Sequence, residues 1–389
     1  MAQAQSEINN HSDNTVTVSV PGKLFLAGEY AVVHSGQAAI ITTVDAFLHL
    51  SLTVVDDNVG YVTTNQADHA IAWHYDRDGR VVSDDPAAQE FPLLWQAIQT
   101  VNLLAIECGI FSASNPPLFT IEIKSELDAA DGTKYGLGSS GAVSVALVSA
   151  LMTQYDLFKD LTESQRVYQV YKLVAITQHR LGMMGSLGDV AASAHTGIIY
   201  YQNFDREWFD AQPKESGADI VSLLENIWPD LMIEPLPIDP DWTLSVVWTK
   251  EKASTEELLK LIPEHVPETE HAEILKTFKQ YAKRQVLMAK AAIQMNDWRL
   301  FKSAISDNYD TILHYTRALD KPYLTKSFKK AISLVTQDHS VAKISGAGAG
   351  DCAYAISNSR AAADQVQAIW RNNALVVLPF AFWQRTHKE

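Results

Sequence analysis

The stretch from Asp131 to Met152 reads DGTKYGLGSSGAVSVALVSALM, and the interpretation of the whole chain starts from it. It places three glycines at G-x-G-x-x-G spacing ahead of a long run of helix formers. Backbone N–H groups at the start of a helix attract anions, so the pattern indicates a phosphate-binding loop. The alternative is a plain glycine-rich surface turn, in which Ser139 would only cap the helix.

Two common nucleotide-binding motifs do not fit this stretch. A dinucleotide-binding turn needs an apolar strand that runs directly into the first glycine, whereas Gly136 follows the loop sequence DAADGTKY. It also needs an acidic residue at the end of a second strand about 20 residues further on, and no clean candidate occurs there. The Walker pattern GxxxxGK(S/T) is absent from the sequence. The loop therefore points to another class of phosphate-binding fold.

The composition narrows the class of protein further. With 389 residues the chain is long enough for two domains, and its 47% hydrophobic and 20% charged residues are typical of a soluble globular protein. A net charge of −15 argues against a nucleic-acid-binding surface. Two cysteines, Cys108 and Cys352, do not suggest a disulfide framework. Residues 1–14 predict a disordered tail without signal-peptide features, so we expect a cytoplasmic protein with no membrane or nucleic-acid partner.

Mixed strand and helix patterns predict an α+β protein rather than a regular βαβ array. Alternating apolar residues predict strands at 16–20 and 46–55, and we expect Pro21-Gly22 to break the first of them. The polar segment 56–85 reads as irregular, and its length suggests a lid over the nucleotide base. Apolar residues at helical spacing predict a helix over 141–154.

The second half of the chain shows the same mixture of elements. The proline-rich stretch 205–241 reads as irregular, so we place a domain boundary at its start and expect domains at 15–205 and 206–389. Two long amphipathic helices are predicted over 268–318. A helix, a strand, a glycine loop, a strand, a helix and a last strand follow in that order.

Two further segments complete a recognisable set. They are PGKLFLAGEYAVVHSGQAAI from Pro21 to Ile40 and KISGAGAGDCAYAI from Lys343 to Ile356. In the second of these the alternating small residues indicate a close approach of the backbone to another chain segment or a ligand, which only Gly and Ala allow. Together with KYGLGSSGAV they match, in order and spacing, the three signature motifs of the GHMP kinases. GEYAV and the Lys-aromatic-GLGSSG form are similar to bacterial-type phosphomevalonate kinases. Ala349 departs from the glycine that this group has in its third motif.

This resemblance covers the chain from about Val16 to the last strand and implies the fold and activity. It implies a ribosomal-protein-S5-like N-terminal domain and a ferredoxin-like α/β-plait C-terminal domain, with ATP and the acceptor in the cleft between them. It implies ATP-dependent phosphorylation of (R)-5-phosphomevalonate, with Mg²⁺ accompanying ATP as co-substrate, by a monomer or homodimer. A mevalonate kinase on the same scaffold and a catalytically silent ligand sensor are the alternatives. Lys23, Ser140 and Asp189 are all present, which argues against the sensor.

The resemblance also assigns residues to ATP. Mg²⁺ usually takes few protein ligands and keeps several waters, so one hydroxyl, that of Ser140, is a sufficient metal contact beside the phosphates. The residues that we expect to bind ATP are Lys134, Gly136, Leu137, Gly138, Ser139, Ser140, Gly141 and Ala142.

Catalytic and acceptor-binding roles follow in the same way. Lys23 is either a phosphate ligand or a solvated strand-edge charge, and Asp189 is either the active-site aspartate or the cap of the following helix. Because the acceptor is already a phosphate with a second pKa of about 6, we expect Asp189 to position it rather than to remove a proton. The residues expected to contact the acceptor or close over the phosphates are Glu29, Tyr30, Ser186, Lys250, Ser345, Gly346, Ala347 and Gly348.

Overall fold

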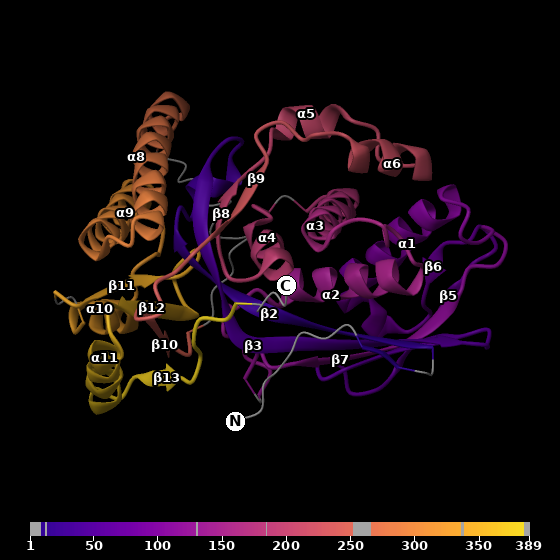
Figure 1. Cartoon of the computed structure of the whole chain (residues 1–389), viewed down its shortest axis with the longest axis horizontal. Coiled ribbons are helices and arrows are strands. Elements are labelled where there is room, and N and C mark those ends of the chain that lie inside the picture. The colour runs from indigo at the N-terminus through magenta and orange to yellow at the C-terminus, as the bar shows by residue number, and fades with distance from the viewer. Residues whose placement is uncertain are drawn as a thin grey trace.

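The computed structural model describes residues 9–11, 14–129, 131–183, 185–251, 266–335 and 338–384. A long nine-stranded sheet and a smaller four-stranded sheet organise these residues, as Figure 1 shows. Both sheets carry helices, so the predicted α+β class is confirmed. Within the described residues no helix is both long enough and apolar enough to cross a membrane.

The first sheet is built around two long antiparallel strands, β2 and β3. Its order is β1-β2-β3-β7-β4-β5-β6, and β8 pairs with both β3 and β9. The alternation of buried and partly exposed residues from Thr15 to Val20 matches the period of a strand with one covered face. The strands are β1 (Asn9–His11), β2 (Thr15–Ala27), β3 (Ala38–Val55), β4 (Gly60–Thr64), β5 (Ile71–Tyr75), β6 (Val81–Val82), β7 (Leu118–Ser125), β8 (Ile198–Gln202) and β9 (Met232–Leu236).

Helices cover one face of this sheet (Figure 1). Helix α2 lies at the centre of the layer and packs against β2, β3 and the helices α1, α3 and α4. Its sequence of Ala, Val, Leu and Ser is apolar on nearly all sides, as a fully enclosed helix requires. The helices are α1 (Pro92–Glu107), α2 (Ser139–Gln154), α3 (Glu163–Arg180), α4 (Gly188–His195), α5 (Arg206–Ala211) and α6 (Gly217–Glu225), with short 3₁₀ turns at Ala31–Val33 (η1) and Pro86–Glu90 (η2).

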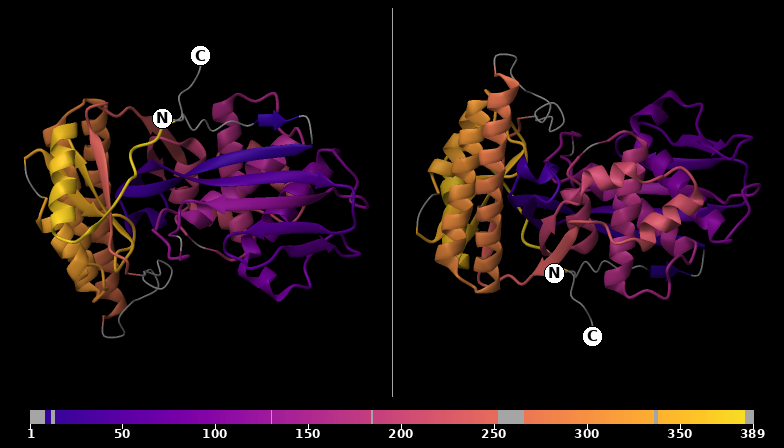
Figure 2. Two further views of the ribbon diagram at one scale, coloured as in Figure 1. Left: turned by 90° about the horizontal axis from the view of Figure 1, so that it is seen from below. Right: turned by 90° about the horizontal axis from the view of Figure 1, so that it is seen from above.

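The second sheet has the strand order β11-β12-β10-β13, and all its pairs are antiparallel. Along the chain, α8, α9 and α10 lie between β10 and β11, and α11 lies between β12 and β13. This order and the strand pairing form the predicted ferredoxin-like α/β plait. Figure 2 shows these helices and strands stacked at one end of the long sheet. The elements are β10 (Thr243–Trp248), α8 (Glu268–Gln294), α9 (Trp298–Ala318), α10 (Lys326–Ser333), β11 (Ser340–Ile344), β12 (Cys352–Ser357), α11 (Arg360–Asn372) and β13 (Val376–Leu378).

The chain crosses between the two sheets twice. The first crossing follows β9, and the second follows β13, after which the chain returns to the long sheet. There Thr43 Oγ1 donates a hydrogen bond of 2.7 Å to the carbonyl of Trp383, and the Trp383 N–H donates to the Thr43 carbonyl at 3.1 Å. The ring of Trp383 also packs edge-on against Phe47, with centroids 5.2 Å apart. The end of the described chain is therefore part of the N-terminal domain.

The structure corrects the expectation that segment 205–241 is irregular. Segment 205–241 is not irregular, because it forms α5, α6 and β9. Strand β9 pairs with β8 in register from Ile198–Leu236 to Gln202–Met232, and α6 packs against α1. Strand β9 therefore extends the first sheet, and we propose that the domain boundary follows β9.

Three smaller expectations also differ from the structure. Pro21-Gly22 does not end the strand, because β2 continues to Ala27 past a register shift between these two residues. Segment 56–85 forms β4, β5 and β6 at the sheet edge, with Trp73 fully buried, rather than a separate flap. Asn9–His11 pair with β2 and so are not disordered, whereas residues 1–8, 12 and 13 of the predicted tail lie outside the described residues.

Gly28 lies just after β2, at a point where the chain passes very close to the start of β3. Its φ is +93°, and an added Cβ would lie 2.2 Å from the carbonyl oxygen of Ala38. We expect Gly28→Ala to lower the free energy of unfolding by about 3 kcal/mol or more, measured by denaturant titration. Gly36→Ala is the matched control, because Gly36 also has a positive φ of +66° but its added Cβ would lie 3.4 Å from the nearest atom. Equal losses in the two variants would contradict the steric argument.

Candidate active site

The three segments singled out in the sequence meet between the two sheets. The Lys23 N–H donates to the Leu137 carbonyl at 2.9 Å, which joins the first segment to the second. The Phe25 N–H donates to Ser345 Oγ at 2.8 Å, and the Tyr30 hydroxyl donates to the Ala347 carbonyl at 2.5 Å, which joins the first to the third. Strand β2 therefore holds both glycine-rich loops in place.

Helix α2 begins at the glycine loop with its N-terminus uncapped by a side chain. Gly138 occupies the N-cap position with φ of +80° and ψ of +38°, and no side chain caps the helix. Ser139 is buried in the first turn and does not act as the cap, whereas Ser140 is exposed. An uncapped helix N-terminus beside an exposed hydroxyl is suited to bind an anion.

Lys23 is buried beside this loop, with 8% of its surface exposed. Its Nζ donates a hydrogen bond of 3.0 Å to the Gly136 carbonyl and lies 5.4 Å from the centroid of the Phe25 ring. Burial lowers the pKa of Lys23, while the carboxylates of Asp189 and then Asp351 act in the opposite direction. The residue is therefore not a solvated strand-edge charge.

Two glycines of the loop leave room for Lys23 and Asp189. A Cβ added at Gly138 would lie 2.8 Å from Cε of Lys23, and one added at Gly141 would lie 2.7 Å from Oδ2 of Asp189. Asp189 lies in the first turn of α4, whose N-cap is Leu187 without a side-chain hydrogen bond. Asp189 thus does not cap this helix, and its carboxylate packs against Gly141 just after the glycine loop.

The residues predicted to contact the acceptor differ in how deeply they are buried. Glu29 is buried and its Oε1 accepts a hydrogen bond from Lys343, a fully buried lysine whose pKa is lowered by burial and raised in part by Glu29. Ser186 makes local contacts: its Oγ accepts from the Gly188 N–H at 3.2 Å. Lys250 is exposed, with its Nζ 5.9 Å from the Trp248 ring centroid.

The glycines of the third segment serve close packing as well as the site. Gly348 has φ of +77°, and a Cβ added there would lie 2.3 Å from the Tyr323 ring. A Cβ added at Gly346 would meet no atom within 4 Å, so this position faces open space. Lys134 is exposed and its backbone forms a bridge to Asp128.

The sequence interpretation missed three charged residues near the site. Lys343 is the buried partner of Glu29, and the Nζ of Lys321 lies 5.7 Å from the Tyr30 ring centroid. Asp351 packs directly on the phosphate loop: a Cβ added at Gly136 would lie 2.5 Å from Cβ of Asp351. Lys343 and Asp351 both lie in the quoted third segment, where Asp351 is the single acidic residue of SGAGAGDC, whereas Lys321 lies in no motif that was singled out.

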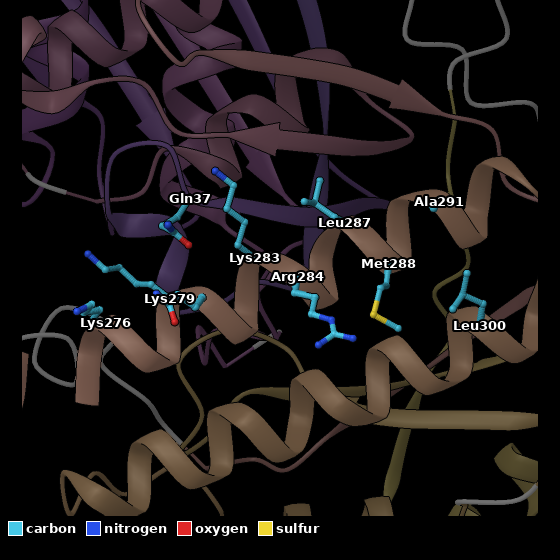
Figure 3. A pocket seen from close by; sticks show the side chains of 10 residues that line it. Gln37, Lys276, Lys279, Lys283, Arg284, Leu287, Met288, Ala291 and Leu300 are labelled. Carbon is cyan, nitrogen blue, oxygen red and sulfur yellow. The ribbon is translucent and has the colours of Figure 1, made fainter. Parts of the chain in front are cut away.

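A groove along α8 lies apart from these loops. It has a volume of about 690 Å³ and none of the predicted site residues lines it. Figure 3 shows lysines toward one end of the groove and Met288 and Leu300 toward the other. Its lining residues are Gln37, Lys276, Lys279, Gln280, Lys283, Arg284, Leu287, Met288, Ala291 and Leu300.

Comparison with known proteins agrees with this arrangement. Residues 93–197 match the GHMP kinases N terminal domain and residues 288–375 match the GHMP kinases C terminal family, so the matches include the second and third segments. The chain is 30% identical over 376 residues to a phosphomevalonate kinase of Streptomyces sp. (strain CL190), covering 94% of this chain and 96% of that relative. The chain therefore belongs to the GHMP kinase family. Within that family its curated relative is a phosphomevalonate kinase.

Solved structures share the fold over nearly the whole chain. A Listeria innocua protein has a TM-score of 0.82 and 28% identity, covering 94% of this chain and 97% of its own. A Streptococcus pneumoniae phosphomevalonate kinase in complex with phosphomevalonate and AMPPNP has a TM-score of 0.77 and 24% identity. The match covers 94% of this chain and 98% of that kinase. The predicted GHMP kinase fold is confirmed.

The loop fits Mg²⁺ that accompanies ATP. In the part of the chain that the structure describes, no group of three or more His, Cys, Asp or Glu side chains is arranged to hold a metal ion. The exposed hydroxyl of Ser140 lies at the uncapped N-terminus of α2, where phosphate oxygens would supply other ligands. One hydroxyl at this position is compatible with a metal ion that is held largely by nucleotide and water.

Gly141→Ala tests whether the space at the loop positions Asp189. We expect the added methyl group to displace the carboxylate and to lower kcat/KM roughly 10²-fold, with little change in melting temperature. Steady-state kinetics and thermal unfolding measure the two effects. Gly185→Ala is the control, because an added Cβ there meets no atom within 4 Å. An unchanged kcat/KM in Gly141→Ala would contradict the positioning of Asp189 by this glycine.

Asp351 should make stability depend on pH. Burial raises its pKa to about 6, with Lys23 and Lys134 opposing the shift. An unfolded Asp has a pKa of about 3.9, so the folded state binds the proton more tightly and loses stability as pH rises between these values. We expect Asp351→Asn to melt higher than the unaltered protein at pH 7 and above, with a smaller difference at pH 5. Asp56→Asn, at an exposed site, is the control, and a difference that shrinks with rising pH would contradict this assignment.

Proposed function

We propose that this protein is a phosphomevalonate kinase of the mevalonate route to isoprenoids. It would catalyse ATP + (R)-5-phosphomevalonate → ADP + (R)-5-diphosphomevalonate. An oxygen of the acceptor phosphate attacks the γ-phosphorus of ATP, and the bond to the β–γ bridging oxygen breaks. The observation that carries the proposal is the meeting of β2, the uncapped α2 loop and the third segment around Lys23 and Asp189.

ATP would bind at the N-terminus of α2. Gly136, Leu137, Gly138, Ser139, Gly141 and Ala142 would surround its phosphates with backbone N–H groups, and Lys134 would add a cation. Ser140 would contact Mg²⁺, which supplies charge neutralisation on the phosphates when it is bound. The exposure of Ser140 and the side-chain-free cap at Gly138 support this assignment.

Two anionic substrates must bind to a chain of net charge −15. Local cations resolve this conflict, because a charge held at short range in a buried site outweighs distant charges screened by salt. Lys23 is the buried cation at the loop, and exposed Lys134 and Lys250 lie on the segments flanking it. We propose that Lys23 contacts the transferred phosphoryl group and that Lys250 reaches the acceptor.

Asp189 would orient the reacting groups rather than act as a strong base. The acceptor phosphate has a second pKa of about 6 and is mostly ionised at neutral pH, so little proton removal is needed. Asp189 acts on Lys23 by its charge and packs on Gly141. It would thereby fix the Lys23 ammonium beside the phosphates.

The acceptor would lie toward Glu29, Tyr30, Ser186 and the loop Ser345–Gly348. The hydrogen bond from Tyr30 to Ala347 and the open space at Gly346 support a small-molecule site on this side. We expect the protein to act as a monomer or a homodimer in the cytoplasm.

The discriminating experiment is ADP release by the purified protein with Mg·ATP. We expect turnover with 5-phosphomevalonate and none above background with mevalonate. Turnover with mevalonate alone would assign the second candidate, a mevalonate kinase. No turnover with either acceptor would reject both kinase assignments and favour a ligand sensor.

The pH dependence of Asp189→Asn tests its role. If Asp189 positions Lys23, the variant should lose a roughly constant factor of about 10²-fold in kcat/KM between pH 6 and pH 8. Turnover that is abolished at pH 6 and restored at pH 8 in step with a deprotonation would instead show that Asp189 is a general base. Ser193→Ala, on the same helix, is a matched control whose hydroxyl bonds the Pro21 carbonyl at 3.1 Å.

A further inference from the structure

We propose that the groove along α8 is a binding site for an anionic amphiphile, that is, a single molecule with a phosphate or diphosphate head and an apolar chain. None of the residues expected to bind ATP or the acceptor lines this groove, so the site is separate from the proposed phosphoryl transfer. Its shape, the change from basic to apolar side chains along it, and the polar groups left without partners point to this class of ligand.

The groove follows a second face of α8. The eight lining residues that α8 supplies succeed one another at steps of three and one positions from Lys276 to Ala291. They therefore form one stripe over about four turns, or roughly 22 Å. The face that packs into the core is a different one and includes Phe278, Ala282 and Val286. A volume of about 690 Å³ is typical of small-molecule sites, and the elongated shape suits a chain-like ligand.

One end of the groove is basic, as Figure 3 shows. Among the residues that the structure describes, Lys279, Lys283 and Arg284 form no ion pair with a carboxylate. Lys276 pairs weakly with Glu273 at 4.0 Å, where both side chains are exposed. Cations without carboxylate partners create a local positive field even on a chain of net charge −15. A phosphate group is the anion that lysine and arginine together bind through charge-assisted hydrogen bonds.

The N-terminal domain contributes to the same groove through Gln37, which precedes β3. The Lys283 Nζ donates to the Gly36 carbonyl at 2.9 Å, which holds this lysine beside Gln37. The side-chain oxygen of Gln37 is buried and has no hydrogen-bond partner within the described part of the chain. Such a group is costly unless a ligand or water satisfies it, and an amide can offer either its oxygen or its NH₂ group to a phosphate. A head group bound here would contact both domains.

The other end of the groove is apolar. Leu287, which is 44% exposed, and Met288 follow the cations along α8, and Leu300 comes from α9. Covering these side chains with a hydrocarbon chain would remove apolar surface from water, which is favourable. An inorganic anion would leave this end uncovered, and a purely apolar molecule would leave the cations without a partner. A molecule with a charged head and an apolar chain matches both ends.

The first test compares n-butyl phosphate with n-octyl phosphate, two probes of equal charge, by isothermal titration calorimetry below the concentration at which micelles form. We expect octyl phosphate to bind at least about tenfold more tightly, because each fully buried methylene group contributes roughly fourfold in affinity. Neither saturating Mg·AMPPNP nor 5-phosphomevalonate should displace it. Equal affinities overturn the proposal, and so does displacement by either compound, which would place the probe in the site already described.

Matched variants separate the two ends of the groove. Lys279→Gln combined with Arg284→Gln should weaken both probes about tenfold or more, whereas Lys329→Gln, at an exposed position on α10, should weaken neither. Leu287→Gln should remove most of the preference for octyl phosphate and leave butyl phosphate unchanged. Met295→Gln is its control, because Met295 is 62% exposed and lies outside the groove. Unchanged affinities in the groove variants, or equal losses in the controls, overturn the proposal.

An anionic membrane presents the same chemistry and is distinguished by a vesicle assay. We expect no cosedimentation of the protein with vesicles of phosphatidylglycerol and phosphatidylcholine at physiological ionic strength. Binding to these vesicles without binding to monomeric octyl phosphate would overturn the proposal and assign the groove to a lipid surface. Equally tight binding of n-octyltrimethylammonium would also overturn it, because the cations would then have no role. None of these measurements involves turnover, so failure of the phosphomevalonate assay leaves them interpretable.

Discussion

The burial of one ammonium group governs the arrangement of this site. Lys23 has little contact with water, its ammonium donates to the Gly136 carbonyl, and the charges of Asp189 and Asp351 oppose the lowering of its pKa by burial. Those partners come from segments far apart in the sequence, and each must approach the lysine closely. The loop is glycine at Gly138 and Gly141 because a larger residue would overlap Lys23 or Asp189.

The rest of the fold gives these segments a rigid support. Strand β2 is held along its length by β3, and its end is bonded to both glycine-rich loops. Helix α2 is enclosed by apolar contacts, and its N-terminus at Gly138 has no side-chain cap. The hydrophobic core thus positions the backbone groups at this helix N-terminus, to which we propose that phosphate binds.

The sequence predicts those elements of the fold that depend on local residue patterns. The long helices α8 and α9 and the order of the C-terminal elements follow from spacing and periodicity, whereas the three motifs were recognised by their resemblance to the GHMP kinases. Prediction from the sequence fails where tertiary contacts decide the structure: β2 continues past Pro21 through a register shift against β3, and β9 is a strand because β8 pairs with it. Asp351 was missed for the same reason, since only the fold brings its carboxylate onto Gly136.

The two chain crossings between the sheets have a mechanical consequence. One follows β9 and the other follows β13, where Trp383 is bonded back to Thr43. The crossing after β9 is a covalent connection, whereas the return after β13 is held on the long sheet by hydrogen bonds and by the packing of Trp383 against Phe47. The last described residues therefore join the two sheets a second time through contacts that can be broken without cutting the chain between them.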